Sequence, residues 1–357
     1  MKARVAVLGA GAWGTAVAKV IAEKGHDTVI WCHDPAGAAD INGEHNNRRR
    51  LPGVELPRNL VAVTDIAEAA AGREFLILAI PSLYLLDVVK RILMVPAIRE
   101  GETTIGVLTK GFLPGPRGPR LILDTLEDYL PGFYRQSLVY IAGPSHAEEV
   151  SRGKVTGLIT ASENAKNSIR FRDLLKTNRL LVFSSFDVRG VQIAAAVKNV
   201  IAIAFGTLDA IKTGETIFGD GTESLLLAAG LNEISGLGRA MGATHGETFT
   251  SISGVGDLDV TCRSVFGRNR RFGREIIEKN ILEGFSGLED LMARIDELGY
   301  LPEGVAAAKY VRILSEQFRL KMPICQGLYQ ILNKEIGPGE FLYSFLDGFM
   351  IRSVNRA

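Results

Sequence analysis

The chain has 357 residues, 46% of them hydrophobic, which is enough material for two domains with large cores. Its 41 basic and 40 acidic residues leave a net charge of +1, and this balance argues against a nucleic-acid-binding surface. Three cysteines, at positions 32, 262 and 325, form neither a metal-ligand pattern nor a disulfide framework, so we expect no metal and a cytoplasmic location.

The sequence contains no evident targeting or membrane-spanning segment. The first residues predict a strand rather than a charged segment followed by an apolar stretch and a cleavage site, so no signal peptide is expected. The best candidate for a membrane span, residues 191–206, is interrupted by Lys198, and we therefore expect no span.

Residues 5–22 combine a short apolar strand, a G-x-G-x-x-G turn and an apolar helix. In such a turn, Gly9 permits the sharp bend, Gly11 leaves room for a pyrophosphate, and Gly14 lets the helix pack closely on the strand. The helix N-terminus then directs unsatisfied N–H groups at the anion. The segment predicts a dinucleotide-binding unit.

Residues 27–34 predict the second strand, whose end contacts the cofactor's ribose. An acidic group there hydrogen-bonds the ribose of NAD, whereas a cationic group suits a 2′-phosphate. His33 and Asp34 stand side by side at this end, and three arginines follow at 48–50. We interpret the arginines as part of a solvated loop. The choice between NADH and NADPH stays open.

Strand-like and helix-like segments alternate up to residue 188, as in a doubly wound parallel sheet. The further strand candidates are residues 75–80, 103–108, 137–142, 155–160 and 179–184. Three of these runs end in the polar corners Pro81-Ser82, Thr109-Lys110-Gly111 and Gly143-Pro144-Ser145-His146. Sheets of this type bind ligands beyond the carboxyl ends of their strands.

The remaining residues, 189–357, predict an all-helical domain. Helices are expected at 190–204, 223–241, 271–279, 287–298 and 305–316. The first of these helices is apolar except for Lys198 and Asn199. Burial disfavours a lysine's charged form, which suits the group for exchanging a proton with a carbonyl or hydroxyl oxygen. The alternative is a lysine whose stem lies along the core and whose ammonium reaches water.

A second polar cluster follows at residues 254–274. Asp257 stands in a glycine-rich turn, where a carboxylate can hold Lys198 or a substrate hydroxyl. Arg268 and Asn269 offer a fork of donors suited to a phosphate ester. Other arginines make this the densest basic segment of the chain, at positions 263, 270, 271 and 274. Taken alone, the segment also fits an exposed basic helix start.

Read together, the motifs GAGAWGTA, LTKG, GPSHAEE, AAAVKNVIAIAFG, GVGDLDVTC, GRNRRFG and LPEG resemble the NAD(P)-dependent glycerol-3-phosphate dehydrogenases of the soluble bacterial type. The resemblance runs from about residue 4 to about residue 335. It implies a Rossmann-type dinucleotide-binding domain over residues 1–188. It also implies a helical substrate-binding domain over 189–357, similar to the C-terminal domain of 6-phosphogluconate dehydrogenase. The expected cofactor is NAD(P), and the expected assembly is a homodimer.

The resemblance also implies roles for individual residues. Lys198 is the catalytic acid/base. The substrate contacts are Lys110, Gly143, Ser145, Lys198, Asp257, Gly267, Arg268 and Asn269. The cofactor contacts are Gly9, Gly11, Ala12, Trp13, Gly14, His33, Lys110, Ala147, Arg268, Leu301 and Glu303.

The chain departs from the family pattern at three places. Gly267 stands where the family usually has a serine, which removes a hydroxyl donor but leaves a backbone N–H. The stretch 223–230 lacks an arginine that the family commonly has, and the loop 207–222 is several residues longer than usual. These changes bear on substrate affinity and cofactor choice rather than on hydride transfer.

The expected reaction is therefore the interconversion of dihydroxyacetone phosphate and sn-glycerol 3-phosphate, feeding glycerophospholipid synthesis. Lys198 protonates the oxygen while the nicotinamide gives a hydride to the carbonyl carbon. One alternative is a related dehydrogenase for another small hydroxy acid, such as 3-hydroxyisobutyrate. The other alternative is a non-catalytic dinucleotide-binding protein, which would bind the cofactor without turnover.

Overall fold

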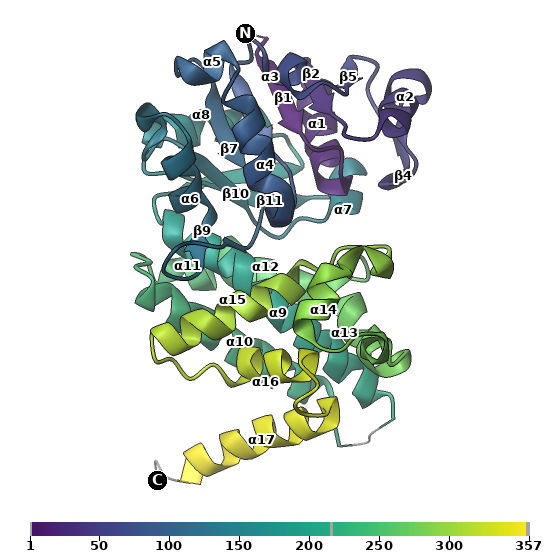
Figure 1. Ribbon diagram of the computed structural model, residues 1–357, viewed down its shortest axis with the longest axis vertical. Coiled ribbons are helices and arrows are strands. Elements are labelled where there is room, and N and C mark those ends of the chain that lie inside the picture. The colour runs from purple at the N-terminus through teal and green to yellow at the C-terminus, as the bar shows by residue number, and fades with distance from the viewer. Residues whose placement is uncertain (1, 215–216, 355–357) are drawn as a thin grey trace. The chain divides into compact units, whose positions relative to one another are not determined.

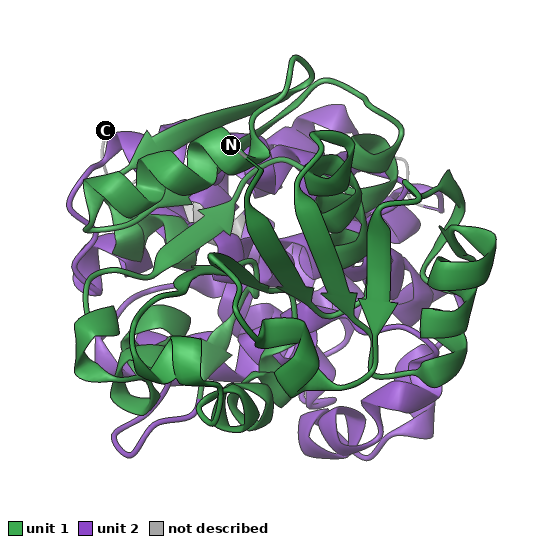
Figure 2. Cartoon of the chain, turned by 90° about the horizontal axis from the view of Figure 1, so that it is seen from above, with its two compact units in different colours: residues 1–113, 120–192 green, residues 114–119, 193–357 purple. Residues whose placement is uncertain are grey.

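The computed structural model describes residues 2–214 and 217–354 and divides the chain into two compact units (Figure 2). Unit 1 comprises residues 1–113 and 120–192, and unit 2 comprises residues 114–119 and 193–357. The division falls slightly after the boundary expected at 188/189, because helix α9 (Val188–Lys212) begins in unit 1 and continues into unit 2.

Unit 1 is built on one eight-stranded sheet. In order across the sheet, the strands are β12 (Leu180–Ser185), β11 (Thr156–Ala161), β10 (Val139–Ala142), β7 (Thr104–Val107), β6 (Phe75–Leu78), β1 (Arg4–Leu8), β2 (Asp27–Trp31) and β5 (Leu60–Val63). The six strands from β10 to β5 run parallel, whereas β11 pairs antiparallel to β10 and parallel to β12. The doubly wound sheet is confirmed, with two strands of opposite direction added at one edge.

The order of the parallel strands reverses between β1 and β6, which is where such sheets bind a dinucleotide. Helices pack on the sheet in two groups, since α1 contacts α7 and α8 while α4 contacts α3 and α6. The helices of this unit are α1 (Ala12–Glu23), α2 (Pro35–Glu44), α3 (Ile66–Ala70), α4 (Ser82–Ile92), α5 (Pro96–Arg99), α6 (Ile122–Tyr129), α7 (Ala147–Ser151) and α8 (Ala165–Leu175).

Two small antiparallel ladders accompany the main sheet. Strands β3 (Asn46–Asn47) and β4 (Leu51–Glu55) enclose the arginine triplet, and β8 (Phe112–Leu113) pairs with β9 (Arg120–Leu121). The segment between β8 and β9 is the part of the first 188 residues that belongs to unit 2.

Unit 2 is helical: the described residues from 189 onward contain no strand. Its helices include α9, α10 (Asp220–Ala240), α11 (Glu247–Thr250), α12 (Asp257–Arg263), α13 (Arg268–Glu278), α14 (Leu288–Ala293), α15 (Glu303–Gln317), α16 (Pro323–Leu332) and α17 (Pro338–Val354). Helix α16 lies against α10 and α15 (Figure 1). The loop expected at residues 207–222 is shorter in the structure, because α9 continues to Lys212 and α10 begins at Asp220. Residues 215–216 of this loop lie outside the described residues.

Helix α9 is the core of unit 2. It is long and apolar enough to cross a membrane, but its most apolar window is wholly buried among other residues. The apolar side chains from Val191 to Leu208 are at most 1% exposed. Its burial is that of a core helix.

Glycines bring α13 into direct backbone contact with α9. A Cβ atom at Gly273 would lie 2.0 Å from the carbonyl oxygen of Ile203, and one at Gly206 would lie 2.0 Å from that of Arg270. The Thr207 hydroxyl also donates to the carbonyl oxygen of Gly273, at 3.3 Å. These two helices can lie this close only because Gly206 and Gly273 have no side chains.

We expect Gly273→Ala to destabilise the protein, because an added methyl group must push α13 away from α9. Overpacking of this kind typically costs about 1–3 kcal/mol. A matched control is Gly236→Ala on α10, where a Cβ would meet nothing within 4 Å. Better helix propensity should make that variant neutral or more stable, by about 0.5–1 kcal/mol. Denaturant unfolding measures both, and equal midpoints for the two variants would contradict the close contact.

A buried carboxylate caps the N-terminus of α16. Glu233 of α10 accepts hydrogen bonds from the backbone N–H groups of Ile324, at 2.7 Å, and Cys325, at 3.1 Å. Burial raises the pKa of Glu233 from 4.5 to about 7, although both hydrogen bonds act in the opposite direction. The folded chain therefore holds this proton at a pH where the unfolded chain has released it.

The stability of the protein should consequently fall as the pH rises through the window from 4.5 to about 7. The full pKa difference corresponds to about 3 kcal/mol. In Glu233→Gln, which cannot titrate, this contribution should be absent. Denaturant unfolding of both proteins at pH 5 and pH 8 gives the change in the free energy of unfolding with pH. If this change were the same in both proteins, Glu233 would not be the group responsible for it.

Candidate active site

The three glycines of the first turn have distinct geometries. Gly9 has φ +118°, and a Cβ there would lie 2.6 Å from the carbonyl oxygen of Ala79. A Cβ at Gly14 would lie 2.0 Å from the carbonyl oxygen of Gly9, whereas one at Gly11 would meet nothing within 4 Å. The turn is therefore tight at both ends and open in the middle, where a pyrophosphate can approach.

Helix α1 starts beside that open position. Gly11 is its N-cap, no side chain caps the helix, and its first turn contains no acidic residue. The backbone N–H groups of Ala12, Trp13 and Gly14 precede the first intrahelical hydrogen bonds. An anion placed there gains these donors and the favourable end of the helix dipole. The residues present thus fit a dinucleotide.

The end of β2 presents an imidazole rather than a carboxylate. His33 is exposed and lies edge-on to Trp31, with ring centroids 6.1 Å apart. Asp34 instead caps α2, accepting a hydrogen bond from the N–H of Ala36 at 3.1 Å. The acidic group that the sequence offers for the ribose is therefore engaged in a helix cap.

Further predicted residues gather where β7 and β10, which are neighbours in the sheet, end. Lys110 follows β7, and Gly143 and Ser145 follow β10. Gly143 has φ +140°, and a Cβ there would lie 2.8 Å from the carbonyl oxygen of Gly157. Ala147 begins α7 and is 7% exposed. These four residues occupy the carboxyl-end edge of the sheet, as the sequence predicts.

In unit 2, Lys198 is buried together with two polar partners. Its Nζ donates to the Asp257 carboxylate and, at 2.9 Å, to Oγ1 of Thr261. Lys198 is 4% exposed, Asp257 1% and Thr261 6%. Lys198 is therefore not a lysine whose ammonium reaches water, and that alternative is excluded.

The local fold explains why both partners face α9. A π-helical turn over residues 252–256 precedes α12, and a Cβ at Gly254 would lie 2.1 Å from the carbonyl oxygen of Phe249. Asp257 begins α12, and Thr261 follows one turn later on the same face. Thr261 is not among the residues predicted from the sequence, although its four-residue spacing from Asp257 is a signal for a shared helix face.

An amide bridge joins three helices next to this cluster. Asn269 of α13 donates from Nδ2 to Oδ1 of Asn199 at 3.0 Å and accepts at Oδ1 from the N–H of Gly304 at 2.9 Å. A Cβ at Gly304 would lie 2.4 Å from the carbonyl oxygen of Asn199. Within the part of the chain that the structure describes, the buried amide nitrogen of Asn199 has no hydrogen-bond partner. The sequence draws attention to Asn199 as the neighbour of Lys198, but Asn199 is not among the predicted site residues.

The basic segment contains one arginine that differs from the rest. Ion pairs with carboxylates of unit 2 engage Arg263, Arg270, Arg271 and Arg274. Arg268, the first residue of α13, is exposed and forms no ion pair among the described residues. Gly267 caps the helix without a side-chain hydrogen bond. The segment is thus mostly a paired helix surface, with one guanidinium available to an anion.

The last two predicted residues, Leu301 and Glu303, follow Tyr300, whose side chain contacts α13. Tyr300 donates its hydroxyl hydrogen to the buried Glu275 carboxylate, and the Arg271 guanidinium lies 4.3 Å from the tyrosine ring centroid. Leu301 is half-buried, and Glu303 begins α15.

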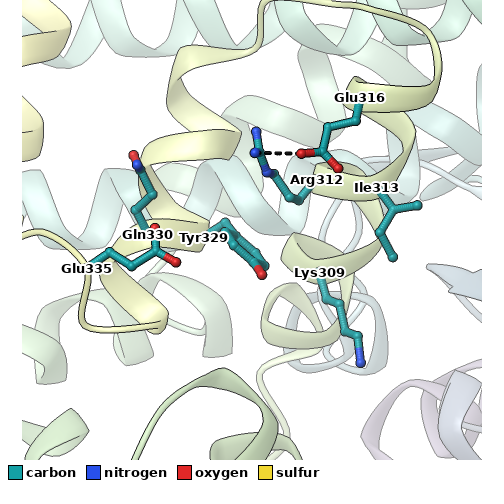
Figure 3. A pocket seen from close by; sticks show the side chains of 7 residues that line it. All are labelled: Lys309, Arg312, Ile313, Glu316, Tyr329, Gln330 and Glu335. Carbon is teal, nitrogen blue, oxygen red and sulfur yellow. Dashed lines mark ion pairs between the residues drawn. The ribbon is translucent and has the colours of Figure 1, made fainter.

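A separate pocket of about 320 Å³ lies on α15 and α16 (Figure 3). None of the predicted site residues lines it, and its Arg312 and Glu316 pair with each other at 2.6 Å. Within residues 2–214 and 217–354, no group of three or more His, Cys, Asp or Glu side chains is arranged to hold a metal ion. The candidate active site therefore consists of the predicted residues around the glycine-rich turn and the sheet edge in unit 1, and of those around Lys198 and the start of α13 in unit 2.

Two family models match the chain. Residues 4–168 match the N-terminal region of NAD-dependent glycerol-3-phosphate dehydrogenase, and residues 187–343 match its C-terminal region. A glycerol-3-phosphate dehydrogenase [NAD(P)+] from Treponema denticola is 56% identical over 98% of this chain and 99% of its own length. The protein of the same name from Bacillus velezensis is 38% identical over 92% and 90%, respectively.

A solved structure gives the same result. The crystal structure of glycerol-3-phosphate dehydrogenase from Coxiella burnetii superposes with a TM-score of 0.83 at 30% identity, covering 97% of this chain and 99% of that one. Sequence and structure agree over nearly the whole length, and the chain belongs to the NAD-dependent glycerol-3-phosphate dehydrogenase family.

Proposed function

We propose that this chain interconverts dihydroxyacetone phosphate and sn-glycerol 3-phosphate with NAD(P), with Lys198 as the acid/base. The observation that carries the assignment of Lys198 is its burial in an apolar helix with Asp257 and Thr261 as partners. Oxidation of NADH or NADPH by the purified protein on addition of dihydroxyacetone phosphate tests the proposed activity directly.

The cofactor supplies the hydride, and the chain's own residues position it. We assign the dinucleotide to Gly9, Gly11, Ala12, Trp13, Gly14 and His33 of the first unit, with Lys110 and Ala147 along the same sheet edge. What supports this assignment is the open position at Gly11 and the uncapped start of α1. By the family resemblance, Arg268, Leu301 and Glu303 add further contacts to the cofactor. Residues 1–188 are accordingly proposed as the cofactor domain and residues 189–357 as the substrate domain.

Lys198 is proposed to give its proton to the carbonyl oxygen during reduction and to recover it during oxidation. Asp257 and Thr261 hold the ammonium in one place, so little reorganisation is needed when charge develops on that oxygen. Among the described residues, the buried amide nitrogen of Asn199, the next residue on α9, has no hydrogen-bond partner, and we propose it as a further donor. Lys110, Gly143 and Ser145 are proposed as additional substrate contacts.

We place the substrate phosphate at the start of α13. The guanidinium of Arg268 and the backbone N–H groups of Arg268 and Asn269 are proposed as its donors. The backbone N–H of Gly267, expected from the sequence to replace the serine hydroxyl, instead donates to the carbonyl oxygen of Ser264 at 3.1 Å. Since one N–H and the oxygen of the Asn269 side-chain amide already make hydrogen bonds within the protein, we propose its backbone N–H as the contact to the phosphate. The lost serine hydroxyl at Gly267 leaves the backbone N–H groups of Arg268 and Asn269 at the start of α13 in place.

Beyond the reaction, we propose a cytoplasmic homodimer whose product feeds glycerophospholipid synthesis. A dehydrogenase for another hydroxy acid, such as 3-hydroxyisobutyrate, would need a carboxylate in place of the phosphate, and kcat/KM for the two substrates separates these cases. A non-catalytic protein would bind NAD(P)H without turnover. The complete Lys198–Asp257–Thr261 cluster argues against that reading.

We expect Lys198→Ala to lower kcat by at least 10²–10⁴, the typical contribution of a positioned general acid. The variant also leaves the Asp257 carboxylate buried without its ammonium, and this typically costs about 3–5 kcal/mol of stability. Activity must therefore be compared at a temperature where circular dichroism shows both proteins folded.

Lys212→Ala is the matched control, because Lys212 lies on the same helix but pairs with Asp220 at 2.6 Å and Glu223 at 2.9 Å. This variant should retain wild-type kcat. A folded Lys198→Ala protein with more than about a tenth of wild-type kcat would show that another group supplies the proton.

We expect Arg268→Ala to act through the phosphate. Loss of a charge-assisted contact of about 1.5–3 kcal/mol lowers kcat/KM for dihydroxyacetone phosphate by roughly ten- to hundredfold. Free dihydroxyacetone has no phosphate, so its already poor turnover should change much less.

The control for this variant is Arg274→Ala, because Arg274 lies on the same helix but is paired with Glu278 at 2.5 Å. It should leave kcat/KM for both substrates nearly unchanged. If Arg268→Ala lowered the turnover of both substrates by the same factor, the phosphate assignment would be wrong.

A further inference from the structure

The two edges of the eight-stranded sheet differ in how their backbone groups are satisfied. At one edge, the side chain of Asn42 on α2 pairs with the backbone of β5. Its Nδ2 donates to the carbonyl oxygen of Ala62 at 2.9 Å, and its Oδ1 accepts from the N–H of Ala62 at 2.8 Å. This amide occupies the hydrogen-bonding position of a further strand, so the edge at β5 is closed.

The opposite edge, β12, is open. The carbonyl oxygens of Arg179 and Ser185 accept hydrogen bonds from backbone N–H groups at the two ends of β11, at 2.9 and 3.2 Å. Because the direction of hydrogen bonding alternates along a strand, the odd-numbered residues of β12 face β11. Val182 and Ser184 therefore direct their N–H and C=O groups away from the sheet. These four groups form no hydrogen bond within the described part of the chain.

The open part of this edge is short and has no feature that would prevent pairing. The outward groups of Leu180 are satisfied by Thr177, whose Oγ1 accepts from the N–H of Leu180 at 2.9 Å and whose N–H donates to its carbonyl oxygen at 3.0 Å. Residues 180–186 contain neither proline nor a charged side chain, which are common means of blocking an edge strand. Val182 and Ser184 are thus available to another strand.

The side chains of β12 point alternately to two faces of the sheet. Leu180 and Val182 are buried on the face that contacts α8. Leu181 and Phe183 point to the opposite face, where Phe183 is 51% exposed, and Val155, just before β11, is also exposed. The open edge therefore carries an apolar surface beside its free backbone groups.

We propose that β12 pairs antiparallel with β12 of a second copy of this chain, about a two-fold axis. Val182 then bonds with the partner's Ser184, and Ser184 with the partner's Val182, so that all the open groups are used. Because the edge at β5 is closed, the joined sheet cannot extend and pairing ends at two copies. The inference deepens the homodimer proposed above by assigning its interface, and it does not depend on the proposed reaction.

The register explains why an identical strand is the partner. The two residues with free groups are spaced two apart, so an inverted copy of the same segment satisfies both of them. Phe183 then lies opposite the partner's Phe183 at a non-hydrogen-bonded position, where side chains across antiparallel strands are closest and aromatic pairs are favourable. Since residues 180–186 are uncharged, self-pairing places no like charges opposite each other.

The first test measures assembly of the full-length protein by disulfide trapping. In Phe183→Cys, the two new thiols lie across the axis with Cα atoms about 4.5 Å apart, within the range that a disulfide bridges. Oxidation with diamide should therefore join the two copies covalently. Phe133→Cys is the matched control, because Phe133 is also 51% exposed but lies in the turn after α6, and it should not cross-link. The three native cysteines are buried and should not contribute.

The second test is Phe183→Lys, which places two ammonium groups opposite each other. Sedimentation equilibrium should show a dissociation constant for the dimer that is raised by roughly a hundredfold or more, since the interface loses two aromatic anchors. Phe133→Lys should leave this constant unchanged, and circular dichroism checks that both variants are folded.

Several results would overturn the interface: a wild-type protein that is monomeric at micromolar concentration, equal cross-linking in the two cysteine variants, or equal dissociation constants in the two lysine variants. If the protein reduces dihydroxyacetone phosphate but Phe183→Cys does not cross-link, the proposed reaction stands while the interface fails. Specific cross-linking without turnover gives the reverse result.

Discussion

The buried ammonium of Lys198 on α9 imposes the constraint on which the arrangement of unit 2 depends. An unpaired charge buried in an apolar helix would cost several kcal/mol, so a carboxylate must be buried beside it. Asp257 meets this requirement only if α12 begins at α9, and the π-helical turn before α12 brings it there. Because α13 follows shortly after, the position of Arg268 depends on the same contact. Satisfying one charge therefore places most of the residues proposed to bind the substrate.

Some buried polar residues near the proposed binding sites also hold separate elements together, so substituting them would affect stability as well as binding. The Asn269 amide joins α9, α13 and the start of α15, so its loss would loosen three helices as well as the phosphate contact. Asn47 has the corresponding position in unit 1, where it joins the β3–β4 hairpin to the glycine-rich turn. In each unit, a buried asparagine thus ties together segments that are far apart in the sequence.

The sequence predicted those features whose signal is local. The glycine-rich turn follows a fixed spacing, buried strands are continuous apolar runs, and Lys198 is a lone charge in an apolar helix. The reversed direction of β11 and β12 carries no such signal, since apolar runs look alike in either direction. The contrast between Arg268 and its neighbours also depends on distant partners: Arg270 pairs with a residue on another helix. These features become visible only in three dimensions.

The backbone contact between α9 and α13 has a consequence for substrate choice. Lys198 lies on one of these helices and Arg268 begins the other, so the gap between the proposed proton donor and the proposed phosphate-binding cation depends on the interhelical spacing. Hydrogen atoms at Gly206 and Gly273 keep that spacing at its minimum. Under the proposed roles, this spacing limits the length of a phosphate ester that can reach both groups. Relatives of this fold that act on longer substrates should be sought among those with larger side chains at these two positions.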